Sequence, residues 1–360
     1  MSPVVSFPHL GDYAVALKPV GRLLGDVVPP PPMTRRTLEL GAAHSPEAAC
    51  LPFKYTLGNL IEALERGADV LVQAGGGCRL GFYGEVQEAI LCRLGYEFGF
   101  LALSNHSTSL RALMREFKRL EPRNSYRAVS RAFALASAKV YALDRVQDLY
   151  RRRLCLAEDL ADVDAAHERF LAELDSAEDA ATVEAAESAA AAAIESLTPR
   201  RDEEPLRVGV VGEVYVAIEP YSNHRLERQL ALHGVEVHRR VTISHVLDAI
   251  FGGRRFVDAV VAEAAPYLAY DIGIDGTKSV AYTNRYMREG FDGVVHVKPF
   301  GCMPEVSAMP ALQRLSRENE FPVLCLSFDV HASETGTATR IAAFCDMLRM
   351  RRSRRCGSRS

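Results

Sequence analysis

The chain has 360 residues, of which 48% are hydrophobic and 25% are charged, and its formal net charge is -3 at pH 7. This composition is ordinary for a folded protein, and a chain of this length usually forms more than one domain. The near-neutral charge argues against a polyanion-binding surface, so we expect no nucleic-acid partner. The sequence shows neither a secretory signal nor an apolar run of about 18 residues, so we expect a cytoplasmic protein with no membrane contact.

Residues 1–107 alternate short β-branched runs with amphipathic segments. Strands are expected at residues 4–7, 70–72 and 98–103, and helices at 13–24, 55–66 and 83–94. Strands that alternate with helices of this length indicate a parallel sheet covered on both faces. We therefore predict a first α/β lobe over residues 1–107.

Residues 108–200 differ from the segments on either side. They lack strand signals and are rich in Ala, Glu, Arg and Leu, and they include the alanine-rich run 185–193. Alanine has the strongest helix propensity but offers little side chain to bury, so this run should pack closely or lie exposed. We predict a helical insertion over residues 108–200.

The alternating pattern returns in residues 201–352. Strands are expected at 207–212, 235–238, 294–297 and 322–327, and helices at 224–233, in the segment up to 290, at 304–317 and at 336–351. This pattern predicts a second parallel-sheet lobe, followed by a basic tail over residues 353–360. The predicted fold class is therefore α/β, with two parallel-sheet lobes and a helical insertion between them.

The eight cysteines of the chain divide into two groups. In a reducing compartment they are not expected to form a disulfide framework. Five suit core packing or the charged end of the chain, because cysteine often behaves as a small hydrophobe; these are Cys92, Cys155, Cys325, Cys345 and Cys356. The other three, Cys50, Cys78 and Cys302, lie among Gly and Pro residues in predicted turns. Cys78 and Cys302 also follow short strands, the place where open α/β sheets bind ligands.

Glycines and cations stand beside these three cysteines. Gly77 immediately precedes Cys78, and Gly301 immediately precedes Cys302. A glycine lets the backbone approach a bulky group and point its N–H groups at it. Nearby cations would offset the negative charge of thiolates, although each could also be an ordinary loop residue; they are Lys54, Arg79 and Lys298.

Three thiolates could hold zinc or an iron-sulphur cluster. Structural zinc sites usually contain a local pair of cysteines two to four residues apart. These three form no such pair, although His9 or His296 could complete a Cys3His site. Three cysteines with an open fourth iron fit a cubane cluster whose unique iron binds substrate, water or a bridging sulphide. We therefore predict an oxygen-sensitive [4Fe-4S] cluster on Cys50, Cys78 and Cys302, with a double-cubane cluster as second choice.

Around these residues the sequence resembles the 2-hydroxyacyl-CoA dehydratase D-component superfamily, and within it the proteins related to acyl-CoA dehydratase activases. The matching segments of the first lobe are 7–13 (FPHLGDY), 32–41 (PMTRRTLELG), 45–54 (SPEAACLPFK) and 67–72 (GADVLV). Those of the second lobe are 210–215 (VVGEVY), 290–305 (GFDGVVHVKPFGCMPE) and 339–340 (TR). The resemblance thus covers both lobes, with its motifs in the same order.

The resemblance implies two flavodoxin-like lobes around an iron-sulphur cluster, with Cys50, Cys78 and Cys302 at the ligand positions. In the dehydratases, a separate actin-like ATPase activator supplies a low-potential electron for the radical removal of water from a 2-hydroxyacyl-CoA. A related branch carries a double-cubane cluster and reduces small molecules. The implied partners are such an activator as electron donor, the chain itself or a homologous subunit in a dimer, and an acyl-CoA or other small-molecule substrate.

The implied activity is that of a lyase or a reductase subunit. The alternative is a non-catalytic binding or scaffold protein with the same fold. Carboxylates in dry sites can have raised pKa values, so Glu47, Glu213 and Glu305 are candidate proton donors, although helix capping or surface exposure would explain each equally well.

Segment 271–278 (DIGIDGTK) looks like the phosphate hairpin of actin-like ATPases. That fold needs a second phosphate loop and an adenosine site downstream, which the following residues do not show. Nor is the segment a P-loop, because Thr277 separates Gly276 from Lys278. We therefore expect no intrinsic ATP hydrolysis.

Overall fold

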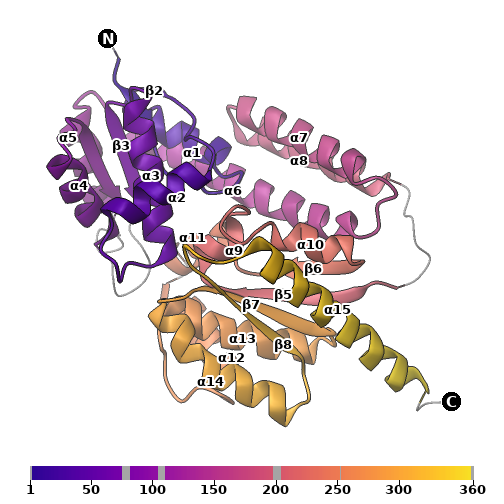
Figure 1. The fold of residues 1–360 in the computed structure, drawn as a ribbon. Coiled ribbons are helices and arrows are strands. Elements are labelled where there is room, and N and C mark those ends of the chain that lie inside the picture. Colours follow the sequence, from indigo (N-terminus) through magenta and orange to yellow (C-terminus); the bar gives the residue numbers. More distant parts are fainter. Residues whose placement is uncertain (1, 75–81, 104–109, 198–203, 252, 358–360) are drawn as a thin grey trace. The chain divides into compact units, whose positions relative to one another are not determined.

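The computed structural model describes residues 2–74, 82–103, 110–197, 204–251 and 253–357. The chain divides into two compact units: unit 1 is Met1–Tyr141 with Leu174–Val183, and unit 2 is Ala142–Glu173 with Glu184–Ser360. Each unit contains a four-stranded sheet in which all strands are parallel (Figure 1). The predicted α/β fold class with two parallel-sheet lobes is therefore confirmed.

The sheet of unit 1 has the strand order β2-β1-β3-β4. Its strands are β1 (Val4–Ser6), β2 (Asp26–Val27), β3 (Val70–Ala74) and β4 (Gly99–Leu103). The accompanying helices are α1 (Ala14–Gly21), α2 (Arg35–His44), α3 (Leu51–Glu65), α4 (Tyr83–Arg93) and α5 (Leu110–Leu120). The strands β1, β3 and β4 and the helices α1, α3 and α4 fall where the sequence predicts them, whereas β2 and α2 were not predicted.

Both faces of this sheet are buried. Successive side chains of β3 pack into two separate hydrophobic clusters, one on each face. Val70 and Val72 join a cluster that includes Val20 of α1 and Phe117 of α5. Leu71, between them, joins a second cluster with the apolar face of α3 and with Leu91 of α4. Side chains alternate across a strand, so this division is what a sheet with helices on both faces requires.

Helices α2 and α3 pack against each other through glycines. A Cβ atom on Gly41 of α2 would lie 1.7 Å from the Lys54 carbonyl oxygen, and one on Gly58 of α3 would lie 1.9 Å from the Thr37 carbonyl oxygen. No other residue fits at either position unless the helices move apart. This close approach positions the start of α3, and with it Cys50.

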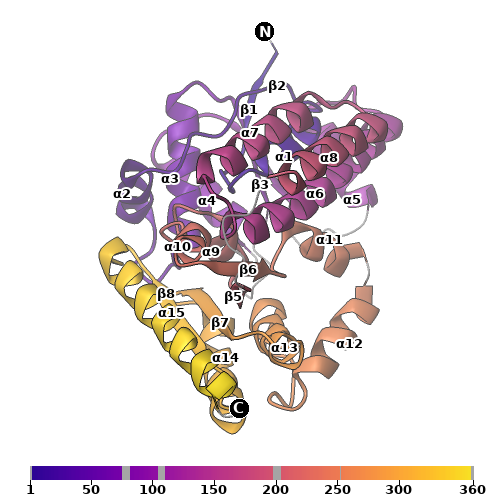
Figure 2. The ribbon, with the colours of Figure 1, turned by 90° about the vertical axis from the view of Figure 1, so that its right-hand side faces the viewer.

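Helices fill the segment that follows the first sheet, as predicted for the insertion. They are α6 (Tyr126–Leu154), α7 (Leu160–Ser176) and α8 (Ala180–Glu195), seen together in Figure 2. The boundary between the two units runs through all three of them. On α8, Val183, Ala186, Ala190 and Ile194 are buried at helical spacing, so the alanine run packs closely along one face.

The sheet of unit 2 has the strand order β6-β5-β7-β8, which repeats the order of unit 1. Its strands are β5 (Leu206–Gly212), β6 (Val235–Arg239), β7 (Gly293–Pro299) and β8 (Val323–Phe328). Its helices are α9 (Val214–Ile218), α10 (Leu226–Leu232), α11 (Ile243–Phe251), α12 (Gly253–Ala264), α13 (Ile274–Arg288), α14 (Met303–Glu318) and α15 (Glu334–Gly357). Both sheets have the first four strands of the flavodoxin order 2-1-3-4-5, in which ligands bind beyond the carboxyl ends of the strands where the order reverses.

Helices also cover both faces of the second sheet. Gly209 of β5 faces the ring of Tyr286 on α13, and a Cβ there would lie 2.4 Å from that ring. Gly293 of β7 faces Phe344 on α15 at 2.9 Å, on the other side of the sheet. Figure 2 shows α15 and α13 on opposite sides of β7. Both faces of this sheet are therefore covered by helices.

Helix α15 continues to Gly357, past the end at residue 351 that the sequence predicts. Arg352 explains part of this extension, because its guanidinium donates to Asp292 Oδ2 at 2.6 Å and to the Pro205 carbonyl at 3.0 Å. The basic residues of this segment therefore begin as the last turns of a helix rather than as a loose tail.

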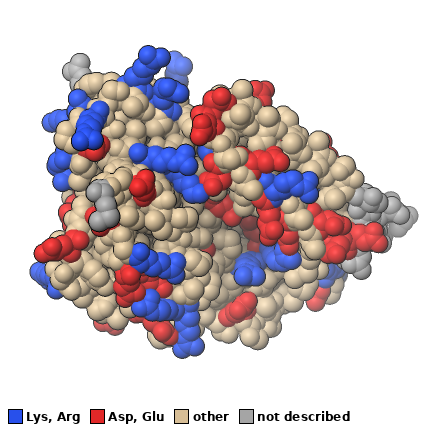
Figure 3. Space-filling view, turned by 90° about the horizontal axis from the view of Figure 1, so that it is seen from above, with Lys and Arg blue, Asp and Glu red and all other residues tan. Residues whose placement is uncertain are grey.

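The outer surface of the helices is polar. The face in Figure 3 carries acidic and basic side chains in neighbouring groups. Arg145 of α6 and Glu187 of α8 form one of the ion pairs between helices. Within the part of the chain that the structure describes, no helix has both the length and the apolar character needed to cross a bilayer.

Candidate functional site

The carboxyl edge of the second sheet has its switch point between β5 and β7. Gly212 ends β5 with a φ of 139°, and a Cβ there would lie 1.8 Å from the Val297 carbonyl oxygen, so only glycine fits. Glu213 follows, and its N–H donates to the same oxygen at 3.1 Å. Its two side-chain oxygens cap α9 by accepting bonds from the N–H groups of Tyr215 and Val216 at 3.0 and 2.9 Å. The capping role considered for Glu213 is confirmed.

Cys302 lies at the same edge, three residues after β7. It is the N-cap residue of α14, and its carbonyl accepts a bond from the Val306 N–H at 2.9 Å. Pro304 is in the first turn, where its missing N–H costs no hydrogen bond. Cys302 is half-buried, and the side chains of Phe300 and Met303, close to it in the sequence, are exposed. A helix N-terminus favours negatively charged groups, so the position suits a thiolate.

Cys50 of unit 1 also lies at the start of a helix, but this helix precedes β3, whereas the helix of Cys302 follows β7. Cys50 is the N-cap residue of α3, again with a proline, Pro52, in the first turn. Its half-buried Sγ makes a short contact with the Tyr83 hydroxyl, and the Tyr83 ring packs edge-on against Phe53 at 5.2 Å between centroids. Cys50 and Cys302 therefore each follow turn or bend residues and are the N-caps of the helices that begin after them.

Three buried side chains hold the Cys50 end of α3 against the carboxyl end of β3. Gln73 of β3 donates to the side-chain oxygen of Gln87 of α4 at 2.7 Å. Gln87 in turn donates to Thr56 Oγ1 of α3 at 2.7 Å. All three are at most 6% exposed. The network therefore ties the first turns of α3 to the carboxyl end of β3.

The other predicted site residues of the first lobe cannot be placed in the same way. Gly77, Cys78 and Arg79 lie outside the described residues. Cys50 belongs to unit 1 and Cys302 to unit 2. The predicted ligand set therefore stays a prediction, supported by the local geometry of its two described members.

Gly301 is the residue at which the backbone of the second lobe is predicted to come close to a bound group. In the described part of the chain, a Cβ at this position would meet no heavy atom within 4 Å, and φ there is not positive. Neither packing nor backbone conformation explains a glycine. The open space in front of it leaves room for a bound group.

The two described cations beside the cysteines have different surroundings. Lys54 donates from Nζ to the Glu47 carbonyl oxygen at 3.2 Å. This contact agrees with the alternative that Lys54 is an ordinary cation bound to a loop. The Glu47 side chain is exposed, so it does not provide a dry proton donor. Lys298 is only 3% exposed, and its Nζ lies 3.5 Å from the Phe300 carbonyl oxygen. Lys298 thus brings a buried positive charge close to the backbone just before Cys302.

Directly behind Cys302, a fully buried polar network joins β7, α13 and α14. His296 Nε2 lies 2.6 Å from Glu305 Oε2, and Ser279 Oγ donates to Glu305 Oε1 at 3.1 Å. None of the three side chains is exposed. Burial lowers the pKa of His296, but bonds to Cys325 and Glu305 outweigh it and raise the pKa to about 9. The raised pKa favours the protonated form of His296, which is paired with Glu305.

Two further carboxyl groups near the same edge hold their protons unusually well. Loss of hydration raises the pKa of Glu213 to about 8, and the negative charge of Asp275 adds to the effect. Loss of hydration also raises the pKa of Asp275 to about 6, although Lys278 opposes the rise. Near neutral pH, Glu213 is mostly protonated and can donate a proton. Asp275, Ser279 and Lys278 all lie on α13 and were not predicted as part of a site.

Segment 271–278 does not form a phosphate hairpin. Asp271 and Gly273 precede α13, which starts at Ile274 and contains Thr277 and Lys278. Thr277 Oγ1 donates to Asp271 Oδ1 at 2.5 Å, so these two residues brace the start of the helix. The rejection of this segment as a phosphate-binding hairpin agrees with its helical conformation.

Among the residues that the structure describes, no three His, Cys, Asp or Glu side chains gather closely enough to hold a metal ion. The chain matches no protein-family model and no curated protein. The resemblance to the dehydratase superfamily therefore rests on the sequence motifs alone.

Proposed function

We propose that this protein is an iron-sulphur protein that binds a cubane cluster through Cys50, Cys78 and Cys302 and takes part in low-potential electron transfer. The observation that carries the proposal is the local geometry that Cys50 and Cys302 share, although α3 precedes the third strand of its sheet and α14 follows it. Each is the N-cap of a helix that starts at the carboxyl edge of a parallel sheet, and the two sheets share one strand order. Core packing alone gives no reason for a half-buried cysteine at the N-cap of each of these helices.

The donor set fits such a cluster. Helix N-termini favour the thiolate form that iron requires, and buried Lys298 adds positive charge near Cys302. Open space at Gly301 leaves room beside the ligand. When bound, the cluster would supply one-electron chemistry at low potential, with an open iron for a substrate oxygen or a bridging sulphide.

The chain's own residues would manage protons and water around the cluster. Glu213, protonated near neutral pH because its pKa is about 8, is positioned at the switch point to donate a proton to a departing hydroxyl group. The buried pair of His296 and Glu305 holds the start of α14 against β7 and excludes water behind Cys302. These features suit either reductive chemistry or removal of water from a 2-hydroxyacyl-CoA, with a separate actin-like ATPase as electron donor.

Protein purified without oxygen is expected to be brown, with broad absorption near about 400 nm, because sulphur-to-iron charge transfer produces colour. Iron and acid-labile sulphide should be present in comparable amounts, and the absorption should bleach in air. Colourless protein that takes up no iron after anaerobic reconstitution would reject the proposal. That outcome would favour the alternative of a non-catalytic binding or scaffold protein.

Gly301→Ala provides a sharper test of the space beside Cys302. The new methyl group meets no protein atom within 4 Å, so stability should change by less than about 0.5 kcal/mol. If a cluster occupies that space, iron retention in air should fall several-fold relative to the wild type. Denaturation curves and timed iron release would measure the two effects. An unchanged release rate would place the bound group elsewhere.

A further inference from the structure

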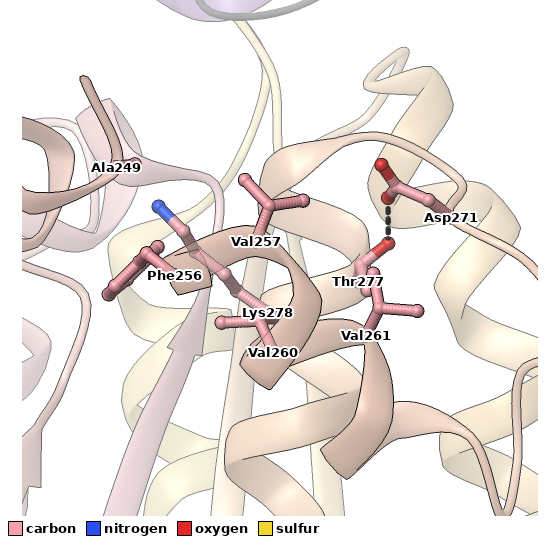
Figure 4. A pocket seen from close by; sticks show the side chains of 8 residues that line it. All are labelled: Ala249, Phe256, Val257, Val260, Val261, Asp271, Thr277 and Lys278. Atoms are coloured by element: carbon pink, nitrogen blue, oxygen red, sulfur yellow. Dashed lines mark hydrogen bonds between the residues drawn. The ribbon is translucent and has the colours of Figure 1, made fainter. Parts of the chain in front are cut away.

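Unit 2 carries a half-buried cysteine, Cys325, on the edge strand of its sheet. β8 ends the order β6-β5-β7-β8, so among the described strands it is paired on one side alone. Cys325 lies in the middle of β8. By contrast, the small pocket between α11, α12 and α13 has a volume of about 10 Å³, room for one water molecule (Figure 4). A small reactant is therefore more readily accommodated at the strand edge than in that pocket.

Cys325 lies beside His296, which links it to Glu305. Cys325 and His296 are direct partners in the parallel register of β8 and β7, so their side chains leave the same face of the sheet. His296 Nε2 lies 2.6 Å from Glu305 Oε2 of the covering helix α14. The cysteine side chain is short, so its sulphur meets the ring on the side nearer to the strand, where Nδ1 lies. Thiol, imidazole and carboxyl group therefore follow one another in a line.

The Nδ1 atom of His296 is the inner end of this line. It is one of the buried side-chain atoms that, among the described residues, have no hydrogen bond of ordinary geometry. Burial lowers the pKa of His296, but contacts with Cys325 and Glu305 raise it to about 9. Sulphur is only a weak hydrogen-bond acceptor, so Nδ1 can still exchange its proton with Cys325. A histidinium beside a thiol favours the thiolate, which is the nucleophilic form.

Core packing, the role that the sequence suggests for Cys325, does not require this arrangement. A cysteine that only fills an apolar strand needs hydrophobic neighbours, and a buried histidine beside it loses its hydration. A nucleophile next to a base that a third group orients is the arrangement of activated thiols in enzymes. Nor do the three groups form a metal site, since the described residues contain no metal-binding set of such side chains. The arrangement therefore suits a reactive thiol.

We propose that Cys325 is a thiolation site that forms a mixed disulfide with a small anionic disulfide. The thiolate of Cys325, paired with the His296 imidazolium, attacks one sulphur of the disulfide. A new S–S bond forms as the old one breaks, and the departing thiolate takes the Nδ1 proton and leaves as a thiol. The disulfide is reduced as Cys325 is oxidised, so no other oxidant is needed. This site goes beyond the iron-sulphur proposal and does not depend on it.

Arg340 of α15 is the reason to expect an anionic reactant. Its guanidinium is exposed and donates to the Cys325 carbonyl oxygen at 2.6 Å. Together with His296 of β7 and Glu305 of α14, Arg340 sets the charge around Cys325. A guanidinium has five N–H donors in a planar fork that matches a carboxylate. A disulfide that carries carboxylates, such as glutathione disulfide, would therefore be drawn to this edge of the sheet.

Glutathione disulfide tests the proposal on the full chain at pH 6.5, with peptide mapping by mass spectrometry to give the rate at each cysteine. Each unit of lower thiol pKa gives about ten times more thiolate but costs about threefold in nucleophilicity, a net gain of about threefold. Cys325 should therefore react at least about threefold faster than Cys92, although Cys92 is more exposed. The ratio of the two rates should fall towards pH 9, where ordinary thiols ionise. A rate at Cys325 no higher than that at Cys92 at pH 6.5 would overturn the proposal.

His296→Gln separates activation by the imidazole from access to the thiol. At pH 6.5 the rate at Cys325 should fall below that at Cys92, because access then favours the exposed cysteine. Circular dichroism checks that the variant is folded, and the pH profile of the wild type tests the same point without a substitution. Cys345 is fully buried, and burial raises its pKa to about 11, so it should stay unmodified. An unchanged rate at Cys325 in folded His296→Gln would contradict activation by His296.

Arg340→Gln tests the preference for an anionic disulfide. Hydroxyethyl disulfide is the neutral comparison, and dividing each rate by that at Cys92 cancels the different reactivities of the two reagents. In the wild type, this relative rate at Cys325 should be several-fold higher for glutathione disulfide than for the neutral reagent. The difference should disappear in Arg340→Gln, with the rate for the neutral reagent retained. Equal relative rates for the two disulfides in the wild type would refute selection by Arg340.

Discussion

Alanine in place of Cys50, Cys78 or Cys302 is expected to remove most of the iron from anaerobically prepared protein. A cluster held by three thiolates has no spare protein ligand, so each single loss should leave it open to release. Iron and sulphide content after reconstitution, with the paramagnetic resonance of the reduced sample, would measure the effect.

The controls for this prediction come from the same chain. Cys92 is exposed on α4 and is predicted to be no ligand, so Cys92→Ala should keep its full iron content. Tyr83→Phe removes the hydroxyl that contacts Cys50 and leaves the thiol, so it reports whether that contact alone matters. Equal iron content in the ligand variants and in Cys92→Ala would refute the assignment of the ligands.

The strands that carry the candidate site could be predicted because they are continuous apolar runs. Every residue of β7 is buried, which is the pattern of a parallel strand covered on both faces. β2 was missed because two residues, Asp26 and Val27, carry no periodicity. α2 was missed for a different reason: its buried face includes Thr37 and Gly41, small residues that allow close contact with α3 but give no apolar signal.

The candidate site was predicted less completely than the fold. Glycine and proline around Cys50 and Cys302 suggested turns, but a proline in the first turn of a helix is equally compatible with a helix start, and both cysteines are N-caps. The polar residues of α13 were overlooked because segment 271–278 was considered only as a phosphate loop. The spacing of Asp275 and Ser279, four residues apart, would have placed both on one face of a helix.

Glu305→Gln is expected to destabilise unit 2 by roughly 3 kcal/mol at pH 6, because it removes the charge that pairs with buried His296. The pKa of His296 is raised from 6.5 in the unfolded chain to about 9 in the folded protein. Because the folded protein binds the His296 proton more tightly than the unfolded chain, this proton stabilises the fold fully below pH 6.5. The stabilisation is lost as the pH rises towards 9. The difference in the free energy of unfolding between the wild type and Glu305→Gln should therefore become smaller between pH 6.5 and pH 9.

Chemical denaturation at several values between pH 6 and pH 9.5 would measure that difference, and groups unaffected by the substitution cancel in the comparison. Glu318→Gln is the matched control on the same helix, since Glu318 is paired with Arg314 at 2.7 Å but is 49% exposed. Solvent screens such a pair, so this variant should lose less than about 0.5 kcal/mol, with little dependence on pH. Similar losses in the two variants, or a gap for Glu305→Gln that widens towards pH 9, would show that His296 is not held as an imidazolium. The start of α14, which carries Cys302, would then depend on packing rather than on a buried charge pair.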